Sequence, residues 1–137
     1  MINTESIKPK IKELADKYGL SLVALFGSQA SGKTHKESDV DIAYASFKPL
    51  DFIEKAKFNT DLTQIFKNDR IDIVDLRQSS PLLMRQATRK AIVLYENTPR
   101  LFDFFYAYAL KLYEEAKPLF DLRKYRLNKI IAEYKHA

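Results

Sequence analysis

The fold is decided by residues 22–44, which read LVALFGSQASGKTHKESDVDIAY. The first five residues form an unbroken apolar run, which indicates a strand buried on both faces. This run ends at Gly27-Ser28, and a polar loop over 29–38 follows. From residue 39 onward acidic and apolar residues alternate with a period of two, which predicts a second strand over 39–44. The polar residues of this stretch therefore lie where one strand ends and the next begins.

Helix and strand patterns continue on both sides of this stretch. Apolar residues recur at helical spacing up to Gly19, whose left-handed preference suits a helix stop, and Asn3 or Thr4 can cap the start. Ser80-Pro81 combines a cap with a proline at the first helical position. We therefore expect a helix ending at Gly19, a helix over 50–67, a strand over 70–76, a helix from 81 to about 89 and a short strand over 91–95.

The chain changes character after residue 97. Two amphipathic stripes follow, and Pro118 between them indicates that one helix ends and another begins. The stripes consist of Leu101, Phe105, Tyr108 and Leu112, and of Phe120, Leu127, Ile130, Ile131 and Tyr134. The expected architecture is α/β (α+β): a core over 1–97 with a small mixed β-sheet flanked by helices, and a C-terminal two-helix extension over 98–137. The extension holds more aromatic residues than one helix face buries, so we expect it to bind a partner.

Composition restricts the classes of protein to consider. The chain has 137 residues, of which 46% are hydrophobic and 30% charged, as in an ordinary soluble globular domain. It lacks a signal-peptide pattern and any apolar stretch near the ~20 residues that span a bilayer, so no membrane association is expected. The absence of cysteine excludes disulfides and a cysteine nucleophile, and it fits a cytoplasmic location. A net charge of +5 favours an anionic partner such as a nucleotide, but it is too mild to predict direct nucleic-acid binding.

Three acidic residues on two expected strands are candidates for metal binding. Asp39 and Asp41 lie two apart on one strand, so both side chains leave the same face. Adjacent anions repel each other unless a cation sits between them, and Mg²⁺ is the hard cation that takes carboxylate oxygens and substrate phosphates. If this strand pairs with the strand over 70–76, Asp72 joins the cluster. Three carboxylates can hold two metal ions ~3.5–4 Å apart, the arrangement for in-line nucleotidyl displacement.

Gly27 and Ser28 are candidates for phosphate binding at the end of the first strand. Glycine lets backbone amides approach a phosphate, the serine hydroxyl can donate to a phosphate oxygen, and Lys33 in the following loop can pair with a triphosphate. Gly27, Gly32 and Lys33-Thr34 also satisfy the P-loop pattern. A P-loop needs a helix that begins at the lysine, and the few residues between Thr34 and the next strand leave no room for one.

Other interpretations of these residues stay open. Asp39 and Asp41 can also be solvent-facing charges that protect an edge strand. Asp75 competes with Asp72 for the third position, but alternation puts Asp75 on the opposite face, where capping the turn after the strand is the simpler role. Ser28 has no supported base beside it, so a nucleophilic role is not expected.

The order of these residues resembles a known signature. Gly27-Ser28 is followed after ten residues by the pair Asp39 and Asp41, with Asp72 downstream. This pattern is similar to that of the DNA-polymerase-β-type nucleotidyltransferase superfamily. The short chain resembles the minimal nucleotidyltransferases within it, specifically the MntA antitoxins that are paired with HepT toxins of the HEPN ribonuclease class. The resemblance covers the chain from the first expected strand to the fourth, and the tail matches more loosely.

The resemblance implies a nucleotidyltransferase fold, a reaction and a set of roles. Asp39 and Asp41 would hold the catalytic metal pair, and Asp72 would complete the site on the side of the nucleophile. Gly27 and Ser28 would bind the nucleotide phosphates. MntA antitoxins use ATP and Mg²⁺ to adenylylate a tyrosine of the HepT toxin, which silences its ribonuclease. The resemblance thus implies an Mg-dependent protein adenylyltransferase that binds a HepT-like partner through its aromatic C-terminal helices.

One departure from the family pattern and two other functions must be weighed. Many relatives carry arginine where this chain has Ser31, and the loss of this cation argues against tight triphosphate binding unless Lys33 or Lys36 substitutes. The first alternative is a non-catalytic antitoxin that acts by occluding the toxin. The second is a nucleotidyltransferase for a small-molecule acceptor, although so short a chain lacks the extra domain that would enclose such a substrate.

Overall fold

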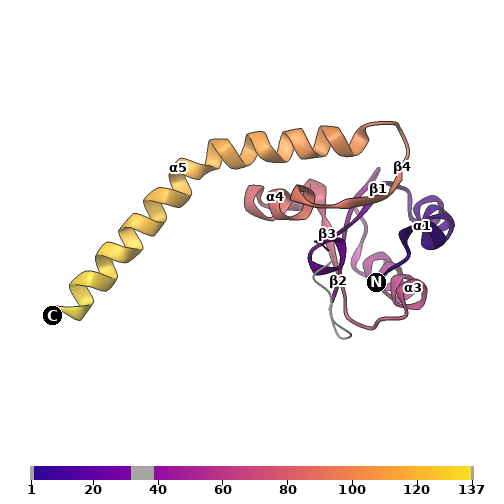
Figure 1. Ribbon diagram of the computed structural model, residues 1–137, viewed down its shortest axis with the longest axis horizontal. Coiled ribbons are helices and arrows are strands. Elements are labelled where there is room, and N and C mark those ends of the chain that lie inside the picture. Colours follow the sequence, from indigo (N-terminus) through magenta and orange to yellow (C-terminus); the bar gives the residue numbers. More distant parts are fainter. Residues whose placement is uncertain (1, 32–38, 137) are drawn as a thin grey trace.

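The fold is built around a four-stranded mixed sheet. The structure is a computed structural model that describes residues 2–31 and 39–136. β1 (Leu20–Phe26) lies between β2 (Val40–Ser46) and β4 (Ile92–Glu96) and runs antiparallel to both, while β3 (Ile71–Asp75) runs parallel to β2. The strand order is β3-β2-β1-β4 (Figure 1). The expected small mixed sheet is confirmed.

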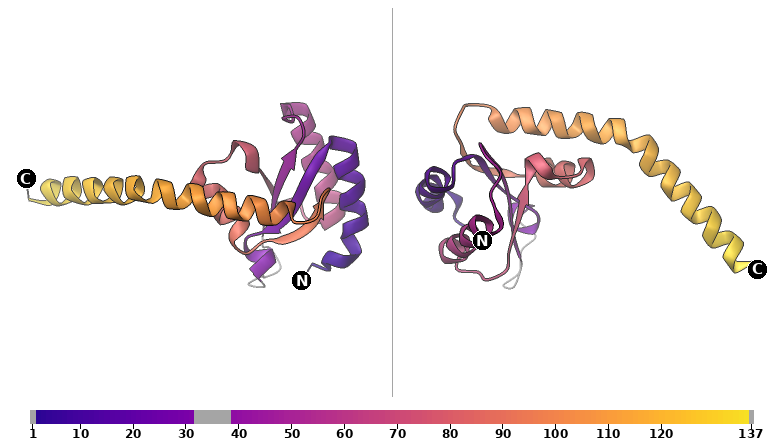
Figure 2. Two further views of the ribbon diagram at one scale, coloured as in Figure 1. Left: turned by 90° about the horizontal axis from the view of Figure 1, so that it is seen from above. Right: turned by 180° about the vertical axis from the view of Figure 1, so that it is seen from behind.

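Two layers of helices enclose this sheet (Figures 1 and 2). α1 (Thr4–Tyr18) and α3 (Phe52–Phe66) cover one face, and α4 (Pro81–Arg89) with the first part of α5 (Leu101–Lys135) covers the other. Each layer has its own core, because alternate residues of a strand point to opposite faces. Two short helices, α2 (Ser28–Ser31) and η1 (Leu76–Gln78), follow β1 and β3. The sequence had indicated a loop where α2 lies.

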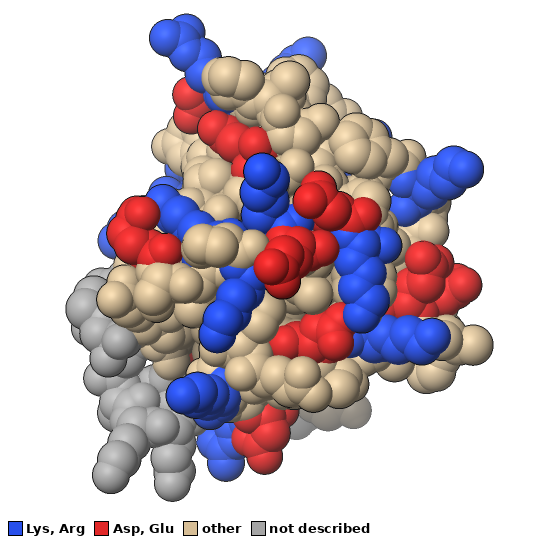
Figure 3. Space-filling model, turned by 90° about the vertical axis from the view of Figure 1, so that its right-hand side faces the viewer, with Lys and Arg blue, Asp and Glu red and all other residues tan. Residues whose placement is uncertain are grey.

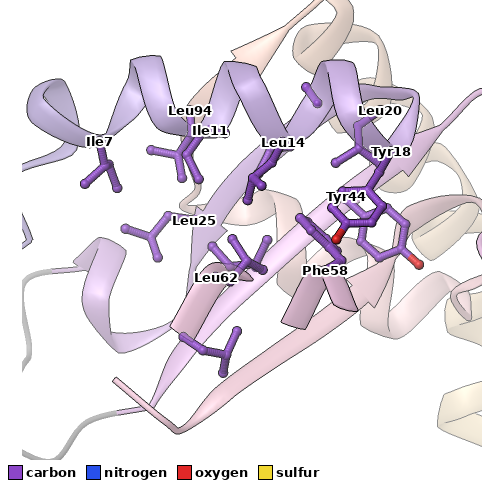
Figure 4. Close-up of a cluster of buried hydrophobic side chains, with 14 of the residues drawn as sticks. Ile7, Ile11, Leu14, Tyr18, Leu20, Leu25, Tyr44, Phe58, Leu62 and Leu94 are labelled. Atoms are coloured by element: carbon purple, nitrogen blue, oxygen red, sulfur yellow. The ribbon is translucent and has the colours of Figure 1, made fainter. Parts of the chain in front are cut away.

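The core beneath α1 and α3 holds the largest buried side chains (Figure 4). The rings of Tyr44 and Phe58 meet edge to face, with centroids 5.4 Å apart, a favoured aromatic geometry. Burial, with the Asp75 carboxylate as a smaller cause, raises the pKa of Tyr44 to about 12, so its hydroxyl stays protonated. These side chains fix β2 against α3, and they leave the opposite face of β2 for other residues.

The helix boundaries follow from capping residues. Asn3 is the cap of α1, where its side chain accepts a hydrogen bond from the Ser6 amide, and Gly19 ends the helix with φ 67°. Both residues are the expected ones, and the structure selects Asn3 over Thr4. Ser80 caps α4 as expected, with its hydroxyl accepting from the Leu83 amide at 3.2 Å.

Tyr18 and Asp61 join α1 to α3. The Tyr18 hydroxyl donates to Asp61 Oδ2 at 2.6 Å, and Lys17 Nζ donates to the same oxygen at 3.0 Å. Burial pushes the pKa of Asp61 upward, but these two hydrogen bonds outweigh it and hold the pKa below its ordinary value of 3.8. The ionised carboxylate therefore contributes to the stability of the fold.

Replacing Tyr18 with Phe is expected to lower the free energy of unfolding by about 1–2 kcal/mol at pH 7, because a charge-assisted hydrogen bond is lost. The stability that Asp61 contributes is present above its unfolded-state pKa and is lost as the pH falls through its lower folded-state pKa. The difference in the free energy of unfolding between the wild type and the variant should therefore become smaller at acidic pH. Urea unfolding at pH 7 and pH 3 measures it. Tyr125→Phe, on an exposed side chain, is the control and should change nothing.

The C-terminal region is one helix rather than two. α5 runs without interruption from Leu101 to Lys135 and contains Pro118, so the expected break at this proline is wrong. Pro118 has no backbone N–H and therefore cannot donate a hydrogen bond to the carbonyl four residues earlier. Residues with high helix propensity on both sides of Pro118 offset this missing hydrogen bond, so the helix continues past it. The ribbon bends partway along its length, in keeping with an internal proline (Figures 1 and 2).

The two parts of α5 differ in their surroundings. Phe105 and Ala109 are buried in the core beneath α4, so the start of the extension belongs to the packed body. Residues 121–136 are all exposed, and this part of the helix projects away from the sheet (Figure 1). No helix within the described residues is long and apolar enough to cross a membrane.

The outer surface of α1 and α3 carries both signs of charge. Figure 3 shows lysine and arginine interspersed with aspartate and glutamate over this face. A nucleic-acid interface usually presents a basic stripe instead. This face therefore gives no support to nucleic-acid binding.

Candidate active site

The register of the parallel strands brings two of the candidate carboxylates together. Asp41 lies directly opposite Asp72 in the β2–β3 pairing. Val40 and Ile42, on either side of Asp41 along β2, are buried beneath α1 and α3, so Asp41 points to the other face of the sheet. Asp39 immediately precedes β2 and is exposed. The pairing of the two strands, on which the expected cluster depends, is present.

Gly27 lies against the Asp41 carboxylate. It follows β1 with φ +75°, a conformation that side chains disfavour, and a Cβ on this residue would overlap Asp41 Oδ2 and lie 3.1 Å from Asp41 Cγ. Ser28 then begins α2, which is closed by a hydrogen bond from the Ala30 amide to the Gly27 carbonyl at 3.2 Å. The end of β1 and the start of β2 thus form one continuous site.

Among the described residues, the charged groups that shift the pKa of Asp41 are carboxylates, and none is a cation. Burial raises the pKa of Asp41, and the charges of Asp72 and Asp39 raise it further. Within residues 2–31 and 39–136, no three acidic or histidine side chains are grouped closely enough to hold a metal ion as they stand. Repulsion between carboxylates opposes such grouping until a cation offsets it. The donor set itself, carboxylate oxygens beside a glycine turn, is of the kind that Mg²⁺ binds.

An open depression lies next to the carboxylates. It has a volume of about 430 Å³ and is lined by Asp39, Asp69, Arg70, Ile71 and Asp72. The Arg70 carbonyl accepts a hydrogen bond from the Val40 amide at 2.9 Å, which holds the start of β3 beside the start of β2. Asp69 and Arg70 are not among the site residues predicted from the sequence. Their position directly before the strand that carries Asp72 is the signal that would have found them.

The other residues that the sequence offered for the site are Lys33, Lys36 and Asp75, and the structure describes only the last of them. Lys33, with Lys36 of the same loop, lies outside the described residues. Asp75 accepts a hydrogen bond from the Arg77 amide at 2.9 Å and caps η1, as expected. Asp75 is therefore occupied at the end of β3, and Asp72 is the residue that faces Asp41.

Replacing Gly27 with Ala is expected to reduce both stability and the nucleotidyl-transfer activity that the sequence signature implies. A side chain at this φ costs about 1–2 kcal/mol, and its overlap with Asp41 displaces the carboxylate, for which we expect a loss of activity of about 100-fold. Gly19→Ala is the matched control, because Gly19 also has positive φ but nothing lies within 4 Å of its added Cβ. Thermal unfolding and single-turnover rates of both variants check this. Equal activity in the two variants would contradict a role for the Gly27–Asp41 contact.

A family comparison agrees with this geometry. Residues 9–100 match the model of the polymerase beta nucleotidyltransferase domain. This span contains the whole sheet, Gly27 and all three carboxylates. The chain belongs to this nucleotidyltransferase family.

Within that family the chain is similar to MntA proteins. It is 36% identical over 76 residues to the protein adenylyltransferase MntA of Shewanella oneidensis, an alignment that covers 56% of this chain and 54% of that protein. It is 30% identical over 90 residues to the probable protein adenylyltransferase MntA of Haemophilus influenzae, covering 66% of this chain and 75% of that protein. The chain thus spans about half the length of the first of these relatives.

Solved structures extend the similarity to the C-terminal helix. A chain in the crystal structure of a toxin–antitoxin with AMP-PNP has a TM-score of 0.73 at 28% identity, covering 90% of this chain and 98% of that one. A chain in the complex of tri-AMPylated Shewanella oneidensis HEPN toxin with MNT antitoxin has a TM-score of 0.69 at 25% identity, covering 93% and 98%. Matches of this coverage include most of α5.

Proposed function

We propose that this chain is an antitoxin protein adenylyltransferase, which transfers AMP from ATP to a tyrosine of a HepT-like HEPN ribonuclease toxin and so neutralises it. The observation that carries the proposal is the pairing of Asp41 with Asp72 beside the Gly27 turn. A nucleotidyltransferase needs such an arrangement, because the phosphates of the nucleotide and the hydroxyl of the acceptor must both lie beside the carboxylates that bind the cations. The similar proteins named protein adenylyltransferase MntA support the choice of AMP and of a protein acceptor.

The nucleotide is proposed to bind with its phosphates at the Gly27 turn. The Gly27 and Ser28 backbone and the Ser28 hydroxyl would contact phosphate oxygens, and Lys33 would add a positive charge. Asp39, Asp41 and Asp72 would hold Mg²⁺, with two ions as the proposed number. Burial and, to a smaller extent, the charges of Asp72 and Asp39 raise the pKa of Asp41, and this supports the assignment because a cation would relieve the repulsion between the carboxylates. When bound, the ions supply positive charge to the attacking and leaving oxygens.

The proposed reaction is an in-line displacement at the α-phosphorus of ATP. The acceptor hydroxyl oxygen forms a bond to the α-phosphorus, and the bond from that phosphorus to the bridging oxygen breaks, releasing pyrophosphate. Asp72 is on the side of the incoming acceptor and takes the hydroxyl proton. The chain otherwise contributes by holding both reactants in line and by placing charge where it develops.

The toxin is proposed to bind along the exposed part of α5, which makes residues 98–137 a partner-binding extension. Apolar side chains form a stripe on this part, although they are largely exposed: Leu119, Leu127, Ile130, Ile131 and Tyr134. Such a stripe on a single projecting helix suits a groove between helices of a partner. Phe105 and Ala109, at the start of the same helix, pack on the face of the sheet to which Asp41 points. A toxin held by α5 would therefore be on the same side as the carboxylates.

The reaction is tested with the protein encoded next to this chain, which is the candidate toxin. The two proteins are mixed with ATP and Mg²⁺, and the expected result is an added AMP mass on a tyrosine of the neighbour, with loss of its ribonuclease activity. Label on small molecules with none on protein would support the small-molecule alternative instead. The proposed setting is the cytoplasm, where ATP and Mg²⁺ are supplied.

A second candidate is an antitoxin that acts by occlusion alone. The exposed apolar stripe of α5 favours it, because binding along this helix needs no chemistry. Replacing Asp39 and Asp41 together with Ala separates the two functions. Neutralisation that survives the double replacement unchanged supports occlusion, and neutralisation that is lost while the toxin still binds supports transfer.

A further inference from the structure

The depression beside the carboxylates lies on the side of β2 away from Gly27. Gly27 ends β1, the depression is formed at the start of β3, and β2 with Asp41 lies between them. With the triphosphate at the Gly27 turn, an acceptor can reach the α-phosphorus from the depression. Its volume of about 430 Å³ is ample for more than one phenol ring.

The residues that line this depression differ in charge. Three are carboxylates, and Arg70 is the one cation among the described residues that line it. Carboxylates repel an acceptor that carries a phosphate but do not repel a neutral phenol. A guanidinium binds a phosphodiester with two parallel hydrogen bonds and offsets this repulsion. Among the described lining residues, Arg70 is therefore the one whose side chain can bind the phosphate of such an acceptor.

We propose that Arg70 determines acceptor specificity by binding the phosphodiester of an AMP that is already attached, so that the enzyme adds a further AMP to it. This inference rests on the proposed function and concerns the acceptor side of the same site. The HEPN toxin in one similar complex is tri-AMPylated, so the acceptor of that complex takes more than one AMP. In this chain the first transfer uses a neutral hydroxyl, and Arg70 acts on the next.

The second transfer has the same balance of bonds as the first. A ribose hydroxyl of the attached AMP forms a bond to the α-phosphorus of a new ATP, and the bond to the bridging oxygen breaks. Pyrophosphate leaves, and the hydroxyl proton passes to the Asp72 carboxylate. No oxidant or reductant is needed, and ATP is the co-reactant in both steps.

The test compares two acceptors, the unmodified toxin and toxin loaded with one AMP by the wild-type chain under limiting ATP. Arg70→Gln removes the charge but keeps the backbone carbonyl that accepts from Val40. We expect the second addition to slow by about 10–100-fold more than the first, as loss of charged hydrogen bonds predicts. Arg70→Lys keeps a point charge and should recover part of the second rate. Arg77→Gln, beyond the other end of β3, is the matched control and should change neither rate.

Peptide mapping by mass spectrometry reads the number and position of the AMP groups. An Arg70→Gln variant that slows both additions equally, or neither, overturns the inference while leaving the proposed function intact. A wild-type chain that adds AMP only once, or adds further groups only to separate residues, also overturns it. A wild-type chain that adds no AMP to any protein overturns the proposed function itself.

Discussion

Asp41→Asn is expected to lower the rate of the proposed AMP transfer by about a thousandfold and, at the same time, to raise the thermal stability of the Mg-free protein by a few degrees. Transfer falls because the carboxylate that contacts Gly27 and faces Asp72 is lost from the centre of the site. Stability rises because the substitution removes a charge that burial and two neighbouring carboxylates disfavour. A residue whose role is structural would show the opposite change in stability.

The difference in stability between the wild type and Asp41→Asn is expected to depend on pH. Since the folded-state pKa of Asp41 is raised, its protonated form contributes stability that is full below the unfolded-state pKa and is lost as the pH rises through the folded-state value. The variant should therefore exceed the wild type in melting temperature at pH 7, and the difference should vanish near pH 3. Added Mg²⁺ should stabilise the wild type and not the variant.

Asp75→Asn is the matched control for this measurement. Asp75 lies on the strand of Asp72 but caps η1, and asparagine is an equally good cap. Transfer activity should stay within about twofold of wild type. A large loss of activity in Asp75→Asn, or unchanged activity in Asp41→Asn, would remove the basis for the proposed site.

The second large effect is expected on partner binding. Replacing Leu127 and Ile131 together with Asp should weaken binding of the proposed toxin partner by at least about 100-fold, because two apolar side chains one turn apart leave the proposed interface. The melting temperature of the isolated protein should stay within about 1 °C, since both side chains are exposed. Titration calorimetry and thermal unfolding of the same samples measure the two quantities.

Tyr125→Asp is the control for this helix. Tyr125 is an exposed aromatic residue of the same segment, but helical spacing puts it on the side opposite Leu127 and Ile131. Its replacement introduces one negative charge, against two in the double variant, and should weaken binding by less than about fivefold. Equal losses in the two variants would mean that charge on the helix, rather than the apolar stripe, decides binding.

The carboxylates were predictable because each lies in a short pattern of period two. Alternation alone assigns Asp41 to one face of a strand and Val40 to the other, and it separates Asp72 from Asp75. The pairing of β2 with β3 in a register that opposes Asp41 to Asp72 was not predictable in the same way. The register of these parallel strands is set by long-range packing beneath α1 and α3. A short stretch of sequence does not contain this information.

The failures of prediction have identifiable causes. Pro118 predicts a break between two helices, but the helix-forming residues around it outweigh its missing hydrogen bond, because helix propensity is summed over the whole segment. The contact of Gly27 with Asp41 depends on two residues of different strands, so the sequence indicated only a glycine turn. Arg70 and Asp69 belong to a connection whose position is fixed by the Val40 hydrogen bond rather than by periodicity.

The continuity of α5 has a consequence for the energetics of recognition. A detached peptide of residues 121–135 would be only marginally helical in water, since the first turn of a helix is costly to nucleate. Here the first turns are already fixed by Phe105 and Ala109 in the core, so the rest of the helix only has to propagate from them over about 39 Å, from Ala109 to Lys135. The projecting part of α5 is thus already helical before it binds the proposed partner. Binding therefore costs less conformational entropy than binding of a disordered segment would, and more of the contact energy remains as binding free energy.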